Sequence, residues 1–229
     1  MDEQRPVPQA RESGFDSARS ERTKFKVWEV LETIALALLV FALLQATVQN
    51  FQVVGSSMEP TLHSGQRLLV NKIVYAKLSS GMARWLLPWR EIPADGDVFV
   101  FHAPRQGEVV VFLPPARSEG GGVFNPGNQD YIKRIVAVPG DTVSAEGGKV
   151  YVNGTALSEP YIREPVNYRL ASRQVPPGYY FVLGDNRNQS SDSHIWGLLP
   201  EENMVGKAWV VYWPFRQWGT LAALSRGAP

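Results

Sequence analysis

The pattern of hydrophobic and polar positions divides the chain into three parts. Residues 1–26 hold six basic and five acidic residues with little aliphatic bulk and no periodicity, and this composition predicts a disordered tail. Residues 27–50 contain an unbroken apolar run. Residues 51–229 alternate between short β-rich runs and turns that contain Gly, Pro or Asn-Gly. The pattern therefore predicts a tail, one hydrophobic segment and one folded domain.

Three interpretations compete for residues 27–50. The uninterrupted apolar run, 34–44, is short, but from Trp28 to Phe51 it extends to about 24 residues, or about 36 Å of helix, against a bilayer core of about 30 Å. A cleaved signal peptide would need a small-x-small site, and residues 45–50 supply a poor one. A buried helix would show a polar stripe, which the apolar run lacks. We therefore expect a single transmembrane signal-anchor helix.

The distribution of basic residues predicts the orientation of this helix. Arg19, Arg22, Lys24 and Lys26 precede it, and no Lys or Arg occurs from 27 to 66. Basic residues concentrate on the cytoplasmic side of membrane proteins. The N-terminus is therefore expected in the cytoplasm, and residues 51–229 outside the plasma (inner) membrane.

Residues 51–229 are expected to form a mainly β domain. Asn153-Gly154 directly follows one β-rich run and predicts a hairpin turn, although with Thr155 it also forms a glycosylation sequon. The predicted strands are 65–70, 97–101, 108–112, 131–138, 149–152, 179–183 and 208–212.

Composition excludes several classes of function. The chain of 229 residues contains no Cys, so disulfides, thiol catalysis and thiolate metal sites are excluded. Its three His residues form no HExxH motif, so we expect no metal. A formal net charge of +1 does not favour a nucleic-acid partner.

Three segments combine residue types that could carry chemistry: 55–62, 130–141 and 184–197. Each taken alone is typical of an ordinary turn or strand end. Lys133, however, has apolar neighbours, and burial would lower its pKa until the neutral amine could accept a serine proton. No Gly-x-Ser-x-Gly elbow is present to suggest a histidine base. Spacing alone does not establish that Ser57 meets Lys133.

In combination and in this order, the three segments resemble those of type I signal peptidases, the membrane-bound Ser/Lys endopeptidases of the bacterial type. The similar sequence covers residues 51–218. The motifs are Ser57-Met-x-Pro-Thr61, Tyr131-Ile-Lys-Arg134 with Pro139-Gly-Asp141, and Gly184-Asp-Asn-Arg187 followed by Ser190-x-Asp-Ser193 and Trp196-Gly197. The resemblance implies a barrel- or sandwich-like β domain that uses no cofactor. Its implied partners are the lipid bilayer and exported preproteins, whose signal peptides are cleaved after small-x-small (Ala-x-Ala) sites.

The resemblance also implies roles for individual residues. Ser57 is the expected nucleophile and Lys133 the general base. Ser190 would orient the lysine amine, and Asp192 would be a structural carboxylate. The substrate would pair as an added strand between residues 51–54 and 130–133. The residues expected to brace the loop are Gly184, Asp185, Asn186 and Arg187, and those expected to bind substrate are Phe51, Gln52, Val53, Met58, Leu62, Tyr131 and Ile132.

The chain departs from the family pattern at three positions. Gly55 stands where some members carry a hydroxyl that serves as the second oxyanion donor. Asn188 stands where Asp is common, and His194 replaces the usual Arg two residues after Asp192. Because an imidazole is fully charged only when protonated, we predict a pH-sensitive brace at His194.

Two other functions compete with a signal peptidase as interpretations of this sequence. A self-cleaving Ser/Lys repressor relative would be cytosolic and carry a DNA-binding region, which the hydrophobic segment and the near-neutral charge do not favour. A membrane-tethered β module could bind extended peptides without cleaving them.

A group of large side chains with helical spacing also has two interpretations. Met82, Trp85, Leu86 and Trp89 are flanked by Arg84 and Arg90. They could pack in the core, or they could form an exposed ridge at the membrane interface, where Trp and Arg are favoured.

Overall fold

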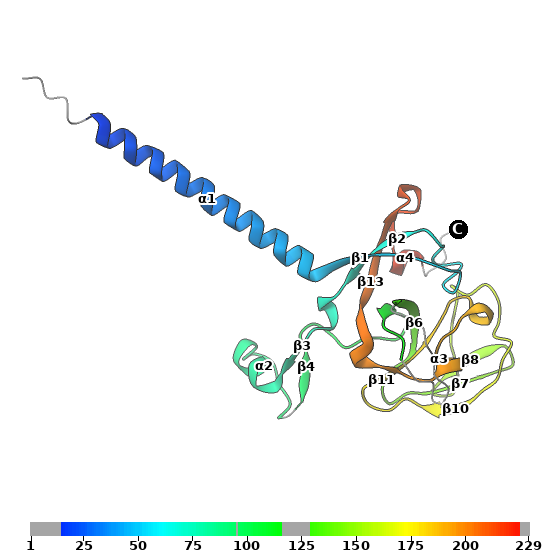
Figure 1. Cartoon of the computed structure of the whole chain (residues 1–229). Helices are drawn as coiled ribbons and strands as arrows, with labels where there is room; N and C mark the ends of the chain where they lie inside the picture. The colour runs from blue at the N-terminus through cyan, green and yellow to red at the C-terminus, as the bar shows by residue number, and fades with distance from the viewer. Residues whose placement is uncertain (1–14, 95, 116–128, 225–229) are drawn as a thin grey trace, which may run out of the picture. The chain divides into compact units, whose positions relative to one another are not determined.

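A computed structural model describes residues 15–94, 96–115 and 129–224. The chain forms two units, Met1–Ala46 and Thr47–Pro229 (Figure 1). The first unit holds most of one long helix, and the second holds the strands.

The helix α1 (Phe15–Thr47) corrects part of the predicted disordered tail, because residues 15–26 are helical. No Gly or Pro interrupts the sequence from Phe15 to Thr47, and Ala, Arg, Glu and Lys are good helix formers. Residues 1–14 of the predicted tail lie outside the described residues. Among the residues that the structure describes, no helix is both long and apolar enough to cross a membrane, so the predicted transmembrane span is not confirmed.

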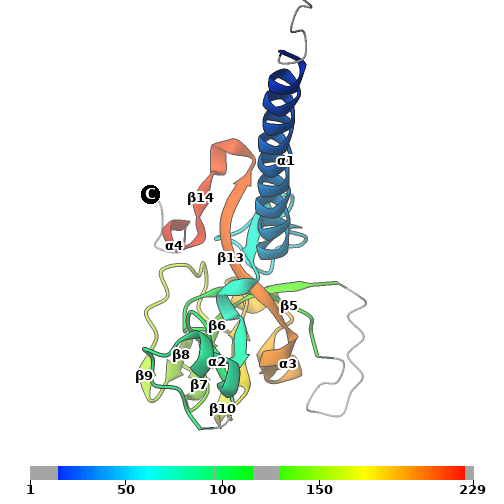
Figure 2. The ribbon, with the colours of Figure 1, turned by 90° about the vertical axis from the view of Figure 1, so that its left-hand side faces the viewer.

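An antiparallel sheet forms the centre of the second unit (Figures 1 and 2). Along this sheet β5 (Val109–Phe112) pairs with β6 (Tyr131–Ala137), so that Val110 lies opposite Lys133. β14 (Gly219–Thr220) pairs with residues 210 and 211 of β13 (Met204–Trp213). The order across the sheet is β1 (Val48–Gln52), β2 (Arg67–Asn71), β13 (Met204–Trp213), β5 (Val109–Phe112), β6 (Tyr131–Ala137), β11 (Tyr179–Leu183) and β12 (Leu199–Pro200).

Two smaller sheets complete the strands. The order in the four-stranded sheet is β10 (Leu170–Gln174), β7 (Thr142–Glu146), β8 (Lys149–Val152) and β9 (Thr155–Ala156), and these strands lie together in Figure 2. β3 (Lys77–Ser79) pairs with β4 (Asp97–Phe99), with α2 (Ser80–Leu86) between them. The remaining helices are η1 (Ile73–Tyr75), η2 (Arg187–Gln189), α3 (Ser193–Trp196), η3 (Glu201–Asn203), η4 (Phe215–Gln217) and α4 (Leu221–Leu224).

The continuous apolar sequence of β5 reflects burial on both faces of the sheet. Successive side chains of a strand point to opposite faces. Val109 and Val111 pack in one cluster with Leu68 and Val211, whereas Val110 and Phe112 pack in another with Trp196. Because both faces of β5 are buried, its sequence does not alternate between apolar and polar residues.

The seven predicted strands are all present, with ends that differ by a few residues. Asn153 (φ 52°) and Gly154 (φ 77°) form the predicted turn between β8 and β9, because both adopt the left-handed conformation that a tight hairpin requires. The predicted boundary at residue 50 is wrong, because β1 already begins at Val48 and pairs with β2. Polar Gln49 and Asn50 suit this half-exposed edge strand better than an apolar helix.

The large side chains around α2 lie on the surface. Trp85 and Trp89 are each 79% exposed, and Met82 and Leu86 are also exposed. The core interpretation of this group is therefore wrong, and the group forms an exposed apolar ridge. Contact of that ridge with a membrane stays a prediction.

Candidate active site

Ser57 lies in the loop that follows β1, and two neighbouring segments fix this loop. The buried Val53 exchanges backbone hydrogen bonds with Gln66 and Gly65, which close the base of the loop. From the other side, the backbone N–H of Asn186 donates to the Ser57 carbonyl at 3.0 Å. The Asn186 side-chain amide donates to the Ser56 carbonyl at 3.1 Å. Asn186 thus attaches the serine loop to the loop after β11.

Lys133 lies on β6 and reaches the same loop. Its side chain is only 4% exposed, although it carries an amine. The Nζ atom donates to Ser57 Oγ at 2.8 Å and to the Ile132 carbonyl at 2.9 Å, and it lies over the ring of Tyr131. The structure therefore brings Ser57 and Lys133 together across 76 residues of sequence.

The surroundings of Lys133 change its acidity. Burial lowers the pKa of Lys133 to about 8 from 10.5, because the charged ammonium loses its hydration. The negative charges of Asp192 and Asp185 act in the opposite direction. A substantial fraction of Lys133 is therefore neutral at mildly alkaline pH, and a neutral amine at hydrogen-bond distance can accept the proton of a serine hydroxyl.

Gly184 and Asp192 hold the loop after β11 close to this pair. A Cβ added to Gly184 would collide with Ser190 Oγ and with the Ser57 carbonyl oxygen, so only glycine fits there. The fully buried Asp192 accepts a hydrogen bond from the Gly184 N–H at 2.9 Å. Ser190 is buried beside them, but its Oγ has no hydrogen-bond partner among the described residues, so the expected bond to the Lys133 amine is not formed.

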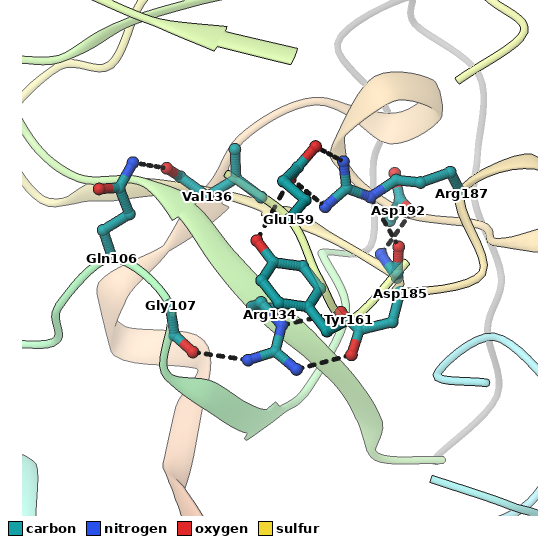
Figure 3. Close-up of polar contacts among 10 residues, drawn as sticks. Gln106, Gly107, Arg134, Val136, Glu159, Tyr161, Asp185, Arg187 and Asp192 are labelled. Carbon is teal, nitrogen blue, oxygen red and sulfur yellow. Dashed lines mark hydrogen bonds and ion pairs between the residues drawn. The ribbon is translucent and has the colours of Figure 1, made fainter. Parts of the chain in front are cut away.

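Two buried ion pairs hold residues of the same loop (Figure 3). The Arg134 guanidinium donates to both carboxylate oxygens of Asp185, at 2.8 and 2.6 Å, and to the Gly107 carbonyl. Arg187 donates to both oxygens of Glu159, at 2.8 and 2.6 Å. The Tyr161 ring lies 4.0 Å from the Arg134 guanidinium carbon and 5.9 Å from that of Arg187. Asp185 and Arg187 therefore brace the loop through charged partners.

A cleft of about 590 Å³ opens at the Ser57–Lys133 pair. It lies beside the start of β6, before the pairing of β6 with β11 begins at Arg134. The predicted substrate-binding residues Phe51, Gln52, Val53, Tyr131 and Ile132 line it. The other lining residues are Val54, Gly55, Ser56, Ser57, Leu68, Val111, Gln129, Asp130, Lys133, Gln189 and Ser191.

Met58 and Leu62 do not line this cleft, which corrects the prediction that they contact substrate. They are 1% and 0% exposed and pack in the core with Leu68 and Val70. Burial of these two apolar side chains anchors the loop on either side of Pro60. They therefore help to position Ser57 through the loop and not through contact with substrate.

Sequence reasoning missed several residues that shape the site. Glu159 and Tyr161 come from a loop between β9 and β10 that carries no recognisable motif. Gln189 and Ser191 line the cleft. Their position next to Ser190, a predicted site residue, is the sequence signal that could have identified them. Asn188 bridges to the loop before β10: its Oδ1 accepts from the Asn167 N–H, and its amide donates to the Pro165 carbonyl. A carboxylate could not make the second bond.

Comparison with known proteins gives the chain its family. Residues 27–213 match the model of the family described as signal peptidase, peptidase S26. The chain is 37% identical to a probable signal peptidase I-1 of Synechocystis, over 86% of this chain and 88% of that protein. It is 34% identical to the signal peptidase I of Leptolyngbya laminosa, over 94% of each. A crystal structure of a signal peptidase I from Enterococcus faecalis is 27% identical, with a TM-score of 0.35 over 46% of this chain and 97% of that one.

The family match and the relatives define a serine peptidase, which excludes the non-enzymatic peptide-binding module. More narrowly, the chain belongs to the type I signal peptidases of family S26, as the sequence motifs predicted.

Proposed function

We propose that this chain is a Ser/Lys endopeptidase that removes N-terminal signal peptides from exported preproteins after Ala-x-Ala sites. The observation that carries the proposal is the 2.8 Å contact between Ser57 Oγ and the amine of Lys133, a lysine that is almost completely buried. Family membership supplies the class of substrate.

The chemistry follows from this contact. Neutral Lys133 takes the hydroxyl proton of Ser57, whose oxygen attacks the scissile carbonyl carbon. The Ser57 backbone N–H would stabilise the resulting oxyanion. The Lys133 ammonium then returns its proton to the leaving amine, and the neutral amine deprotonates the water that hydrolyses the acyl-enzyme.

The cleft suits an extended peptide. Residues 51–57 and 129–133 line it, and the backbones of these two segments could form hydrogen bonds with a substrate strand. Val53 and Ile132 contribute apolar surface to the lining, which also includes Ser57 and Lys133. We infer that small substrate residues at positions −1 and −3 fit against this surface, whereas large side chains would be excluded.

The experiment for this proposal is cleavage of a preprotein by the detergent-solubilised full-length chain across pH 6–10. We expect cleavage after the second Ala of an Ala-x-Ala site, and loss of cleavage when that Ala is replaced by Phe. Because the pKa of Lys133 is about 8, kcat/KM should fall about tenfold for each pH unit below that value, as the amine becomes protonated. Cleavage that is insensitive to the residue at −1, or a profile that is flat from pH 6 to 9, would contradict the proposal.

We also propose that residues 27–47, the C-terminal part of α1, anchor the chain in the plasma (inner) membrane, with the N-terminus in the cytoplasm and the strands that follow outside. This proposal rests on the apolar sequence and on the absence of basic residues from 27 to 66. The full-length chain should remain in the membrane fraction after an alkaline carbonate wash. Leu38→Glu together with Leu39→Glu should release a substantial fraction, because each mid-membrane carboxylate costs about 2.5–3.5 kcal/mol. Complete release of the parent chain by the wash would refute the anchor.

A further inference from the structure

Two carboxylates act on the Lys133 amine, and their charges are compensated to different extents. Asp185 forms a two-bond ion pair with Arg134, and both side chains are buried. Because a guanidinium stays charged at every accessible pH, the charge of Asp185 is permanently compensated. Asp192 is also fully buried, but within the described part of the chain its ion pair is with a histidine, His194. Its effective charge therefore depends on the state of that imidazole.

The geometry holds the His194 ring against Asp192. His194 Nδ1 lies 2.6 Å from Asp192 Oδ1, and the His194 backbone N–H also bonds to that oxygen. Tyr168, from the loop before β10, stacks on the imidazole with ring centroids 4.2 Å apart and planes only 5° from parallel. Since the carboxylate can only accept, Nδ1 must carry the proton in the neutral ring as well as in the charged one. The contact therefore survives a change of charge.

The other charged groups around this position are already paired. Arg187 and Glu159, which lie near Tyr168, are joined by two hydrogen bonds. On the Lys133 side the amine faces Ser57, the Tyr131 ring, and the two aspartates. The Arg187 guanidinium is a permanent cation, whereas the His194 imidazole can bind Asp192 with or without a positive charge.

We propose that His194 is a positioning residue that sets the charge Asp192 presents to Lys133, and so sets the balance between the neutral and charged forms of the general base. This inference rests on the proposed Ser/Lys function. A neutral imidazole leaves the Asp192 charge uncompensated, which favours the ammonium form of Lys133. A permanent cation at position 194 would compensate Asp192 and favour the free amine at lower pH.

The test compares the full-length parent with His194→Arg and His194→Gln in detergent. The activity readout is kcat/KM against pH on a peptide with an Ala-x-Ala site. With Arg at 194 the acidic limb of the profile should move to lower pH by about half a unit or more, because an added cation now compensates a nearby carboxylate. With Gln at 194, which can donate a hydrogen bond but carries no charge, the limb should not move to lower pH. A purely structural role would lower the rate at every pH without moving the limb.

A second readout does not depend on activity. In protein labelled with 13C at lysine Cε, the Cε resonance that disappears in Lys133→Met reports the protonation of Lys133 directly. That titration should shift to lower pH in His194→Arg by the same amount as the acidic limb. If it shifts while no variant cleaves peptide, the proposed function fails and the inference stands. If the parent cleaves and neither readout moves in the Arg variant, the inference is overturned. Should the Arg variant fail to fold, His194→Lys supplies the same charge.

Discussion

Replacing Lys133 by Met is expected to reduce kcat/KM by at least about 10³-fold, because the reaction loses the amine that lies 2.8 Å from Ser57 Oγ and would act as its base. Ser57→Ala should cause a loss of similar size, and the double variant should lose no more than either single variant, since the two groups act as one unit. Cleavage of an Ala-x-Ala preprotein measures all three. Lys149→Met, which removes an exposed lysine at the start of β8, is the matched control and should retain full activity.

The same Lys133→Met variant should be at least as stable as the parent, which separates loss of chemistry from loss of folding. Burial lowers the pKa of Lys133 from 10.5 to about 8. Below pH 8 Lys133 is an ammonium in both the folded and the unfolded chain. Burying this charged form lowers the free energy of unfolding by about 3 kcal/mol. This cost is fully present below pH 8 and disappears as the pH rises toward 10.5. The gain in thermal stability on substitution should shrink over the same range. A Lys133→Met variant that still cleaves would show that another group is the base.

The contact between Ser57 and Lys133 can be anticipated through the resemblance of three short motifs to those of type I signal peptidases, and not from the spacing of the two residues. Ser57 sits in a turn after a strand, and Lys133 lies within an apolar strand, where alternation places it on the same face as Tyr131 and Ile135. Their meeting is a property of the sheet. It depends on the sheet order, which brings the ends of β1 and β6 to one cleft, and no local pattern encodes that order.

Other features depend on burial that a local pattern does not determine. Met58 and Leu62 follow Ser57 in the sequence, and their position predicts contact with substrate. Both side chains are instead buried in the hydrophobic core next to the loop. The start of α1 was missed because a mixed-charge segment such as residues 15–26 is compatible with either helix or disorder. Glu159 can be identified as the ion-pair partner of Arg187 only from the fold, because the two residues lie far apart in sequence.

Asp185→Ala is expected to reduce the free energy of unfolding by about 3–5 kcal/mol, the largest stability effect that this site predicts. The Arg134 guanidinium is 2% exposed and places two of its nitrogens on the Asp185 carboxylate. Removing the carboxylate would leave a buried cation with its Gly107 carbonyl and the Tyr161 ring, but no counter-charge. Thermal and urea unfolding of the full-length protein in mild detergent measure the change. Asp97→Ala, at an exposed strand position, is the control and should change stability by less than about 0.5 kcal/mol.

A double variant tests whether the unpaired charge is the cause. Arg134→Met with Asp185→Leu replaces both charged groups by apolar side chains, and a buried ion pair replaced in this way is often neutral in stability. We expect the double variant to recover most of the loss seen in Asp185→Ala. It should also keep Lys133 active, because Arg134 and Asp185 are lost together and the net charge near the amine is unchanged. If the double variant is as unstable as the single one, contacts of the Asp185 side chain other than its ion pair with Arg134 determine the stability.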